Sequence, residues 1–320
     1  MNAPPLLVSF DSLHRLFLAC GVEDNSSAAS SLSALVEIGF PPIVSKATLG
    51  VLFGYSPRFI GAMCKNPDRY YRTFYLPKGN GKFRRIDAPR VALKVIQKWA
   101  GFHLANNLKL SPSVVGFIPK ISAIDGAARH CSQDWVFSTD IENFFQTTAQ
   151  SRVTQSLIKF GFPAEGAELF SKLSCLNGNL AQGAPCSPVL SNICFSEFDV
   201  LIENYSLDNE LVYTRYADDI VISGRGNPPP DLENKILEIV TAAGWSISSS
   251  KTRFSRRPNR LKVYGLLVSG DVPRLTKGYR NRIRALRHLE NSGKLSPESE
   301  DVALGHLSYA KSVERFGLGS

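Results

Sequence analysis

The sequence lacks the patterns that define zinc proteins, disulfide scaffolds and membrane proteins. Its six cysteines include no Cys-x-x-Cys pair, and its five histidines fall at no metal-ligand spacing. No run approaches the roughly 20 apolar residues that a helix needs to cross a bilayer. Met1–Val8 lacks the basic and apolar regions of a secretory signal, and no internal repeat is present. We therefore expect a reduced, cytoplasmic protein with no membrane partner.

What the sequence does have is an ordinary globular composition with a basic balance. The chain has 320 residues, 43% of them hydrophobic and 20% charged, with a formal net charge of +9 and a pI of about 9.3. This length suffices for one large domain or for two to three subdomains that share a core. A basic surface suits a polyanion, because Lys and Arg displace counterions from phosphates. Many basic proteins bind no nucleic acid, so the charge alone leaves the partner open.

The spacing of apolar residues predicts an α+β protein in which strands and helices are interleaved. Helices are expected at Ser9–Cys20, Ser26–Phe40, Ser45–Leu52, Ser56–Cys64, Val91–Asn107, Ser151–Phe160, Ala164–Leu176, Val189–Tyr205 and Leu232–Ala243. Strands are expected at Trp135–Ile141, Leu211–Tyr216, Ile220–Ser223, Trp245–Lys251 and Leu261–Val268. The tail from Asp271 is predicted to be helical and basic.

A hairpin with a basic tip is expected at Tyr70–Ala88. Its two β-rich segments meet at Lys78-Gly79-Asn80-Gly81-Lys82, a Gly-Asn-Gly turn between lysines. Basic ribbons that are merely solvated are common. The hairpin by itself therefore indicates either a phosphate-binding element or a solvated ribbon.

The most informative local feature is Tyr216-Ala217-Asp218-Asp219. Two adjacent acids lie between apolar strands, where an uncompensated carboxylate is unfavourable. Asp140 ends another apolar strand and would supply a third carboxylate if that strand lies beside the hairpin. Three such groups are able to hold two Mg²⁺ ions roughly 4 Å apart, an arrangement suited to phosphoryl transfer from a nucleoside triphosphate. The alternative for an isolated Asp-Asp pair is an exposed turn.

Six segments, in the same order, resemble the motifs of the reverse transcriptase family. They are the Lys78–Ala88 hairpin, Asp140–Phe145, Gln182–Pro188, Tyr216–Asp219, Gly244–Thr252 and Val263–Val268. The resemblance covers about Tyr75 to Ser269 and implies a right-hand polymerase fold. It implies an N-terminal helical region at 1–68, fingers and palm at 69–270, and a basic helical thumb at 271–320. The implied activity is RNA-templated DNA synthesis from dNTPs with two Mg²⁺ ions.

The resemblance also assigns roles to the residues that match. Asp140, Asp218 and Asp219 would be the catalytic metal ligands, with the backbone carbonyl of Ile141 as a further ligand. Nucleotide-binding residues would be Lys78, Arg84, Phe145, Gln182 and Lys251. Nucleic-acid contacts would come from His130, Tyr264, Gly265, Arg274, Lys277, Arg280, Arg284 and Arg287.

Several of these roles have a structural alternative. Lys78 and Arg84 would reach the triphosphate, and Phe145 would exclude a 2′-hydroxyl unless it only packs in the core. Lys251 would protonate the pyrophosphate unless it is a solvated lysine. A buried histidine is the alternative for His130, and a solvated basic helix is the alternative for the thumb.

Within the family, the chain most resembles the bacterial retron type. Retron enzymes carry Asn-Ala-x-x-His before the first catalytic Asp and Val-Thr-Gly in the primer-positioning segment. This chain has Gly126-Ala127-Ala128-Arg129-His130 and Val263-Tyr264-Gly265, so Gly126 and Tyr264 depart from the pattern.

The retron resemblance implies a structured noncoding RNA as template and primer, and a DNA product that stays with the protein. It also implies an effector protein in antiphage defence. The alternatives are a group II intron-like or abortive-infection reverse transcriptase, an RNA-dependent RNA polymerase, and a non-catalytic RNA-binding scaffold.

Overall fold

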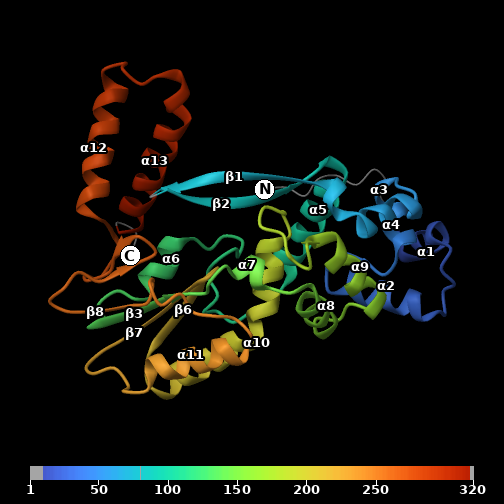
Figure 1. Cartoon of the computed structure of the whole chain (residues 1–320), viewed down its shortest axis with the longest axis horizontal. Helices are drawn as coiled ribbons and strands as arrows, with labels where there is room; N and C mark the ends of the chain where they lie inside the picture. The colour runs from blue at the N-terminus through green and yellow to red at the C-terminus, as the bar shows by residue number, and fades with distance from the viewer. Residues whose placement is uncertain (1–9, 80, 318–320) are drawn as a thin grey trace. The chain divides into compact units, whose positions relative to one another are not determined.

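The computed structural model describes residues 10–79 and 81–317, which form two compact units (Figure 1). The first unit comprises the described residues up to Ser111 together with Phe117–Pro119 and Glu142–Glu197. The second comprises Pro112–Gly116, Lys120–Ile141 and the described residues from Phe198 onward. Asp140, Asp218 and Asp219 lie in the same unit as the C-terminal residues 271–317. The expectations for Met1–Val8 and for Asn80 lie outside the described residues.

Serine caps determine where the N-terminal helices of the first unit begin. Ser12, Ser26, Ser45 and Ser56 each accept a hydrogen bond from a backbone N–H in the first turn of the following helix. The helices are α1 (Leu13–Cys20), α2 (Ser27–Glu37), α3 (Lys46–Phe53) and α4 (Pro57–Lys65), followed by the 3₁₀ turn η1 (Pro67–Tyr70). They confirm the four helices that the sequence predicts.

The remainder of the first unit carries the basic hairpin and a second group of helices. The hairpin consists of β1 (Tyr71–Gly79) and β2 (Lys82–Pro89), which pair antiparallel from Tyr71–Pro89 to Gly79–Lys82. The other elements are α5 (Val91–Asn107), α7 (Phe144–Thr147), α8 (Gln150–Lys159), α9 (Ala164–Ser174), β4 (Cys175–Leu176) and β5 (Asn179–Leu180). The long helix α10 (Ser187–Asp208) begins in this unit and ends in the second.

A four-stranded antiparallel sheet organises the second unit, with strand order β6-β7-β3-β8. Its strands are β3 (Trp135–Asp140), β6 (Val212–Tyr216), β7 (Asp219–Gly224) and β8 (Arg253–Arg256). Trp135, Ile220 and Ile222 are fully buried. Helix α11 (Leu232–Ala242) and the C-terminal part of α10 lie along one face of the sheet, and the short helix α6 (Ala123–Ala128) precedes β3 (Figure 1).

The C-terminal part of the second unit combines a small sheet with two helices. The sheet has the order β11-β10-β9 and contains β9 (Lys262–Val263), β10 (Leu266–Leu267) and β11 (Arg274–Leu275). Helices α12 (Lys277–Asn291) and α13 (Pro297–Phe316) follow and pack side by side (Figure 1). Leu261, Leu266, Leu275, Ile283 and Val313 belong to the buried cluster that joins these elements.

Three secondary-structure predictions are wrong. Trp245–Lys251 is not a strand: only Ile247 forms a bridge, to Ile141, and the Lys251 N–H donates to the Ser248 carbonyl (2.9 Å) in a turn. Leu261–Val268 is two strands, because Tyr264 (φ 50°) and Gly265 (φ 82°) form a two-residue reverse turn between them.

The third error concerns Arg274, which lies in the short strand β11 and not in the basic helix. Among the residues that the structure describes, no helix is both long enough and apolar enough to cross a membrane.

Candidate active site

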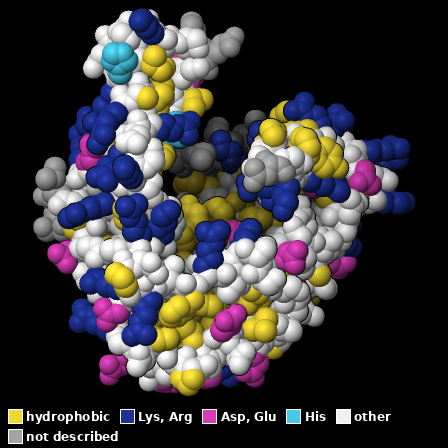
Figure 2. All heavy atoms as spheres, turned by 60° about the vertical axis from the view of Figure 1, so that its left-hand side comes forward, with side chains coloured by type: hydrophobic (Ala, Val, Ile, Leu, Met, Phe, Trp, Pro, Cys, Tyr) yellow, Lys and Arg dark blue, Asp and Glu magenta, His cyan; other side chains and the backbone are white. Residues whose placement is uncertain are grey.

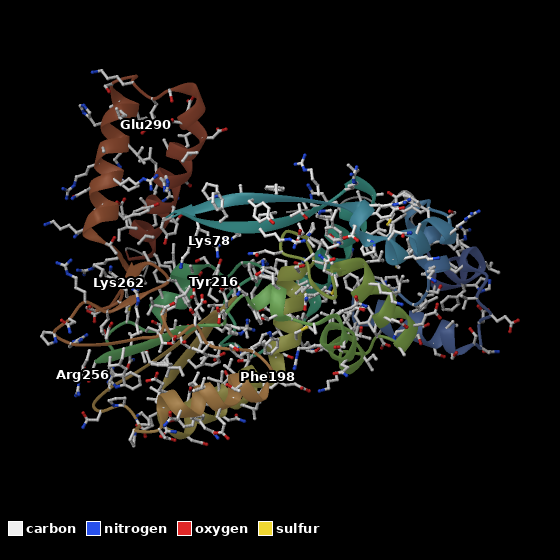
Figure 3. The ribbon with its side chains drawn as sticks, in the orientation of Figure 1. Lys78, Phe198, Tyr216, Arg256, Lys262 and Glu290 are labelled. Atoms are coloured by element: carbon white, nitrogen blue, oxygen red, sulfur yellow. The ribbon has the colours of Figure 1, made fainter. Side chains whose placement is uncertain are left out.

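Three carboxylates meet at one end of the sheet in the second unit. Asp140 is the last residue of β3, and Asp219, the first residue of β7, is its direct partner in the antiparallel register. Asp218 precedes Asp219 in the turn that follows Tyr216, which Figure 3 labels. The Ile141 N–H donates to the Asp218 carbonyl (3.0 Å), so the chain beyond β3 is tied to this turn. The strand that ends in Asp140 thus lies beside the acidic hairpin, as the sequence predicts.

The negative charge of this cluster is only partly neutralised. The Lys251 ammonium donates to Asp140 Oδ2 (2.6 Å), with 57% of the lysine side chain exposed against 8% of the aspartate. Burial, and then the charge of Asp140, raise the pKa of Asp218. Asp219 as a residue is exposed, but partial burial of its carboxyl group, and then the charges of Asp218 and Asp140, raise its pKa to about 6. One lysine therefore does not compensate three acids.

The chemistry of these donors fits a divalent cation. Carboxylate oxygens are the ligands that Mg²⁺ prefers, and a cation would relieve the repulsion that raises the two pKa values. Among the described residues, no three His, Cys, Asp or Glu side chains are arranged as a metal cage. The acids are therefore adjacent and electrostatically suited to a cation without forming a closed cage.

A buried ion pair supports the turn that carries the acids. The side chains of Arg215 and Asp199 are both 0% exposed and bond in bidentate fashion, with Nε–Oδ1 and Nη2–Oδ2 distances of 2.7 Å. The Tyr213 hydroxyl donates to the same carboxylate (2.7 Å). Arg215 Nη1 also donates to the carbonyl of Ala217 (2.9 Å), the residue before Asp218, whose φ of 57° is unusual for a non-glycine residue. The guanidinium thus fixes the backbone of the turn that carries Asp218 and Asp219.

The segment Ser113–Gly116 supports the same turn from its backbone side. Arg215 N–H donates to the Ser113 carbonyl (2.9 Å), and the Val115 and Gly116 N–H groups donate to the Arg215 carbonyl (2.9 and 3.2 Å). A Cβ at Gly116 would lie 2.5 Å from the Ala217 nitrogen, so only glycine fits here. Neither this segment nor the ion pair is predicted by the sequence.

His130 does not lie where nucleic acid would reach it. Its side chain is 0% exposed, and its Nδ1 and Nε2 atoms lie 2.7 Å from Ser223 Oγ and Thr214 Oγ1. Burial, assisted by the charge of Arg129, lowers the pKa of His130 to about 3, so its imidazole is neutral. The prediction of direct nucleic-acid contact is therefore wrong, and His130 is a buried histidine that connects the turn after α6 to β6 and β7.

The predicted thumb residues form an exposed basic surface in the second unit. Lys277, Arg280, Arg284 and Arg287 follow one another at intervals of three or four residues, so they share one face of α12. Arg274 in β11 is exposed as well, and Figure 2 shows Lys and Arg side chains gathered over these helices. Arg287 pairs weakly with Glu314 of α13 (3.4 Å).

The other predicted nucleotide-binding residues lie in the first unit. Lys78 and Arg84 are exposed on the hairpin, Lys78 at a register shift near its tip (Figure 3), whereas Arg85 pairs with Asp87 (3.0 Å). Gln182 accepts a hydrogen bond from Gln146 (2.9 Å), and its carbonyl accepts one from the Asp87 N–H (2.7 Å). The structure therefore joins the Gln182 segment to the hairpin within this unit.

Phe144 and Phe145 have different surroundings in the first unit. Phe144 is buried against Phe195 with edge-on ring geometry and a centroid distance of 5.9 Å. Phe145 is half-buried, with its ring centroid 6.4 Å from that of Phe117. Phe145 is thus the member of the pair with surface left for a ligand.

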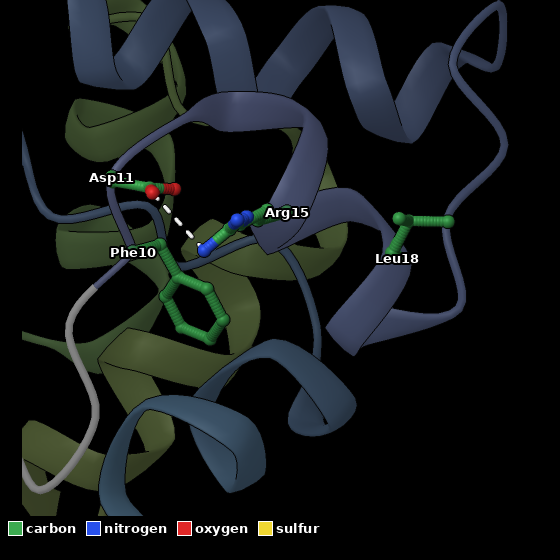
Figure 4. A pocket seen from close by; sticks show the side chains of 4 residues that line it. All are labelled: Phe10, Asp11, Arg15 and Leu18. Carbon is green, nitrogen blue, oxygen red and sulfur yellow. Dashed lines mark ion pairs between the residues drawn. The ribbon is translucent and has the colours of Figure 1, made fainter.

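A surface pocket on α1 has no chemistry related to these residues. It is lined by Phe10, Asp11, Arg15 and Leu18, and Arg15 pairs with Asp11 across 3.0 Å (Figure 4).

Comparisons with known proteins identify the family to which this chain belongs. Residues 76–268 match the family described as reverse transcriptase (RNA-dependent DNA polymerase). The Retron Ec86 reverse transcriptase of Escherichia coli is 30% identical, over 78% of this chain and 74% of that protein. The Retron Mx65 reverse transcriptase of Myxococcus xanthus is 30% identical over 83% and 66%, respectively. The Retron Se72 reverse transcriptase of Salmonella heidelberg is 28% identical over 78% and 68%.

The chain therefore belongs to the reverse transcriptase family, the RNA-directed DNA polymerases with a right-hand fold. Its similarity to these curated relatives confirms the retron-type resemblance seen in the sequence. A solved foamy viral protease-reverse transcriptase bound to double-stranded DNA is 16% identical, with a TM-score of 0.45, over 75% of this chain and 36% of that one.

Proposed function

We propose that this chain copies part of a structured noncoding RNA into single-stranded DNA, using the carboxylates of Asp140, Asp218 and Asp219. The observation that carries the proposal is the juxtaposition of these three acids at one end of the sheet, where the pKa values of Asp218 and Asp219 are raised. A merely structural cluster would be expected to have its charges paired, because neighbouring carboxylates that are partly shielded from water repel one another.

The three aspartates, with the Ile141 carbonyl, would hold two Mg²⁺ ions. Bound there, the ions would activate the primer hydroxyl and neutralise the leaving pyrophosphate. Lys251 already donates to Asp140 and is mostly exposed, so it is free to turn toward the pyrophosphate and give it a proton. Lys78 and Arg84 would bind the triphosphate, Gln182 would line the nucleotide pocket, and Phe145 would contact the sugar and disfavour a 2′-hydroxyl.

The nucleic acid would be gripped through its backbone. The exposed face of α12 with Arg274 suits the phosphates of a template–primer duplex, because backbone contacts of this kind are independent of sequence. Tyr264 and Gly265, in the turn between β9 and β10, would hold the primer end. An effector protein and a role in antiphage defence follow from the retron resemblance.

The test is to identify nucleic acid that co-purifies with the protein expressed from its native locus. We expect a DNase-sensitive species of defined length, attached to RNA, that is absent in Asp218→Asn. The matched control is Asp208→Asn, which removes an exposed aspartate at the end of α10 and should leave the species unchanged. If only RNA co-purifies, and equally with all three proteins, the proposal fails in favour of an RNA-binding scaffold.

A further inference from the structure

Gly126 lies in the middle of helix α6, where glycine is a poor choice. Its backbone has ordinary helical geometry, so no positive φ requires glycine there. In such a helix alanine is normally the more stabilising residue. Glycine is therefore explained at this position by a lack of room for a side chain.

The space is occupied by the ring of Tyr264. A Cβ built on Gly126 would lie 2.9 Å from Tyr264 Cε2 and 2.8 Å from Val115 Cγ2, both too close for real side chains. The tyrosine ring cannot easily move away, because its hydroxyl is hydrogen-bonded to Thr214 Oγ1 (2.7 Å). Gly126 and Tyr264 are also the two positions at which this chain departs from the retron motifs, and the structure brings them into contact.

Tyr264 connects two functional turns of the second unit. Its backbone, at φ 50°, forms the first residue of the β9–β10 turn. Its ring lies 5.5 Å from the ring of Tyr216, which directly precedes the catalytic turn. A shift of the Tyr264 ring would therefore displace both the β9–β10 turn and the residues beside Asp218.

A hydrogen-bonded chain anchors the hydroxyl of Tyr264. Thr214 Oγ1 bonds to both Tyr264 and His130 Nε2, and His130 Nδ1 bonds to Ser223. A neutral imidazole has one donor and one acceptor nitrogen, so the chain is satisfied at every link. The anchor therefore runs from the β9–β10 turn through β6 and the turn after α6 to β7.

We propose that Gly126 and Tyr264 form a matched pair that holds the β9–β10 turn against the catalytic turn and so positions the primer end. Tyr264 is a positioning residue, and Gly126 provides the space for its ring. The inference rests on the proposed function in that a primer is required for the positioning to matter. The packing of the pair is independent of that function.

The experiment is a double-mutant cycle with Gly126→Ala and Tyr264→Thr. Primer–template KM, dNTP KM, kcat and melting temperature are measured for the wild type, both single variants and the double variant. Gly278→Ala is the matched control, because it adds the same methyl group in helix α12 where no atom lies within 4 Å. Gly126→Ala is also combined with Val115→Ala, which shows whether the added Cβ is opposed by Tyr264 or by Val115.

We expect Gly126→Ala to raise the primer–template KM by about tenfold, equivalent to about 1.4 kcal/mol, with the dNTP KM unchanged. It should also lower the melting temperature, whereas Gly278→Ala should not. In the Tyr264→Thr background, the added methyl should have a smaller effect, since its contact with the ring is gone and its contact with Val115 Cγ2 (2.8 Å) remains. If Gly126→Ala alone fails to fold, recovery of folding in the double variant with Tyr264→Thr still supports the proposed pairing of the two residues.

Three results would overturn the inference. The first is that Gly126→Ala changes the primer–template KM and the melting temperature no more than Gly278→Ala does. The second is that the effect of Gly126→Ala is equal with and without the Tyr264 ring. The third is that Val115→Ala, and not Tyr264→Thr, removes the effect of Gly126→Ala. A wild-type protein that extends no primer would instead refute the proposed function, and the melting temperatures would still decide whether the two residues are coupled.

Discussion

Replacing Asp199 by asparagine should lower both the stability of the second unit and the rate of catalysis. Asp199→Asn keeps the shape of the side chain but leaves the Arg215 guanidinium charged, fully buried and without its counter-ion. Removing one partner of such a pair typically destabilises a protein by about 3–5 kcal/mol. At roughly 2–4 °C per kcal/mol, the melting temperature should fall by about 10 °C.

Catalysis should fall for a related reason. Arg215 Nη1 holds the Ala217 carbonyl at 2.9 Å, and a guanidinium without Asp199 is no longer fixed in that direction. A displacement of about 1 Å at the acids is able to reduce kcat by roughly 10²-fold. Tyr213→Phe, which removes only the hydroxyl bond to Asp199, should have a smaller effect on both quantities, because the ion pair remains.

The double substitution Asp199→Leu with Arg215→Met is the decisive variant. Apolar residues of similar size often replace a buried ion pair without loss of stability. We therefore expect the melting temperature to return toward that of the wild type while kcat stays low, because Ala217 still lacks its donor. Thermal unfolding and primer extension measure the two effects. A double variant with full activity, or Asp199→Asn with an unchanged melting temperature, would refute the role assigned to Arg215.

Three further predictions concern the acids and the nucleotide. Lys251→Met should lower kcat by about 10²-fold, as expected for a lost general acid, whereas the control Lys235→Met on α11 should have no effect. If single-turnover assays give equal activities for the two variants, Lys251 is only a solvated lysine. Phe145→Ala should reduce the preference for dNTP over rNTP by about 10–100-fold in competition assays, and an unchanged ratio would mean that Phe145 only packs. When a chelator removes divalent cations, the folded protein should bind more protons than the unfolded chain between about pH 4 and pH 6. The reason is that the pKa of Asp219 is raised from 3.8 to about 6 in the folded state. The melting temperature should therefore fall as pH rises through this window, and only by a few degrees because Asp219 is exposed. Mg²⁺ should reverse this loss. A melting temperature that does not change with pH, in the wild type and in Asp219→Asn alike, would contradict the prediction.

Local signals explain which parts of the fold could be predicted from the sequence. The serine caps and apolar spacing define the N-terminal helices, and the β-rich segments around Ala217 define the hairpin of the acids. Trp245–Lys251 was mistaken for a strand because its Trp-Ser-Ile-Ser alternation matches one. Ile247 alone forms a β-bridge there, so no ladder forms, and the paired strand begins at Arg253.

The supporting residues of the site could not be predicted, because they depend on contacts between distant elements. Asp199 is one polar position in a mixed helix, and Arg215 is one basic position at a strand end. Nothing local indicates that the two side chains are buried and paired. In the same way, Gly126 and Tyr264 were recognised as departures from a motif, whereas their contact depends on the packing of α6 against the β9–β10 turn.

The most direct test of the central claim is primer extension on an RNA template with dNTPs and Mg²⁺. The wild type and Asp208→Asn should incorporate dNTPs at equal rates, whereas Asp218→Asn should be slower by about 10³-fold or more, with unchanged folding and RNA binding. If Asp218→Asn extends the primer as fast as the wild type, the three carboxylates are not the catalytic centre.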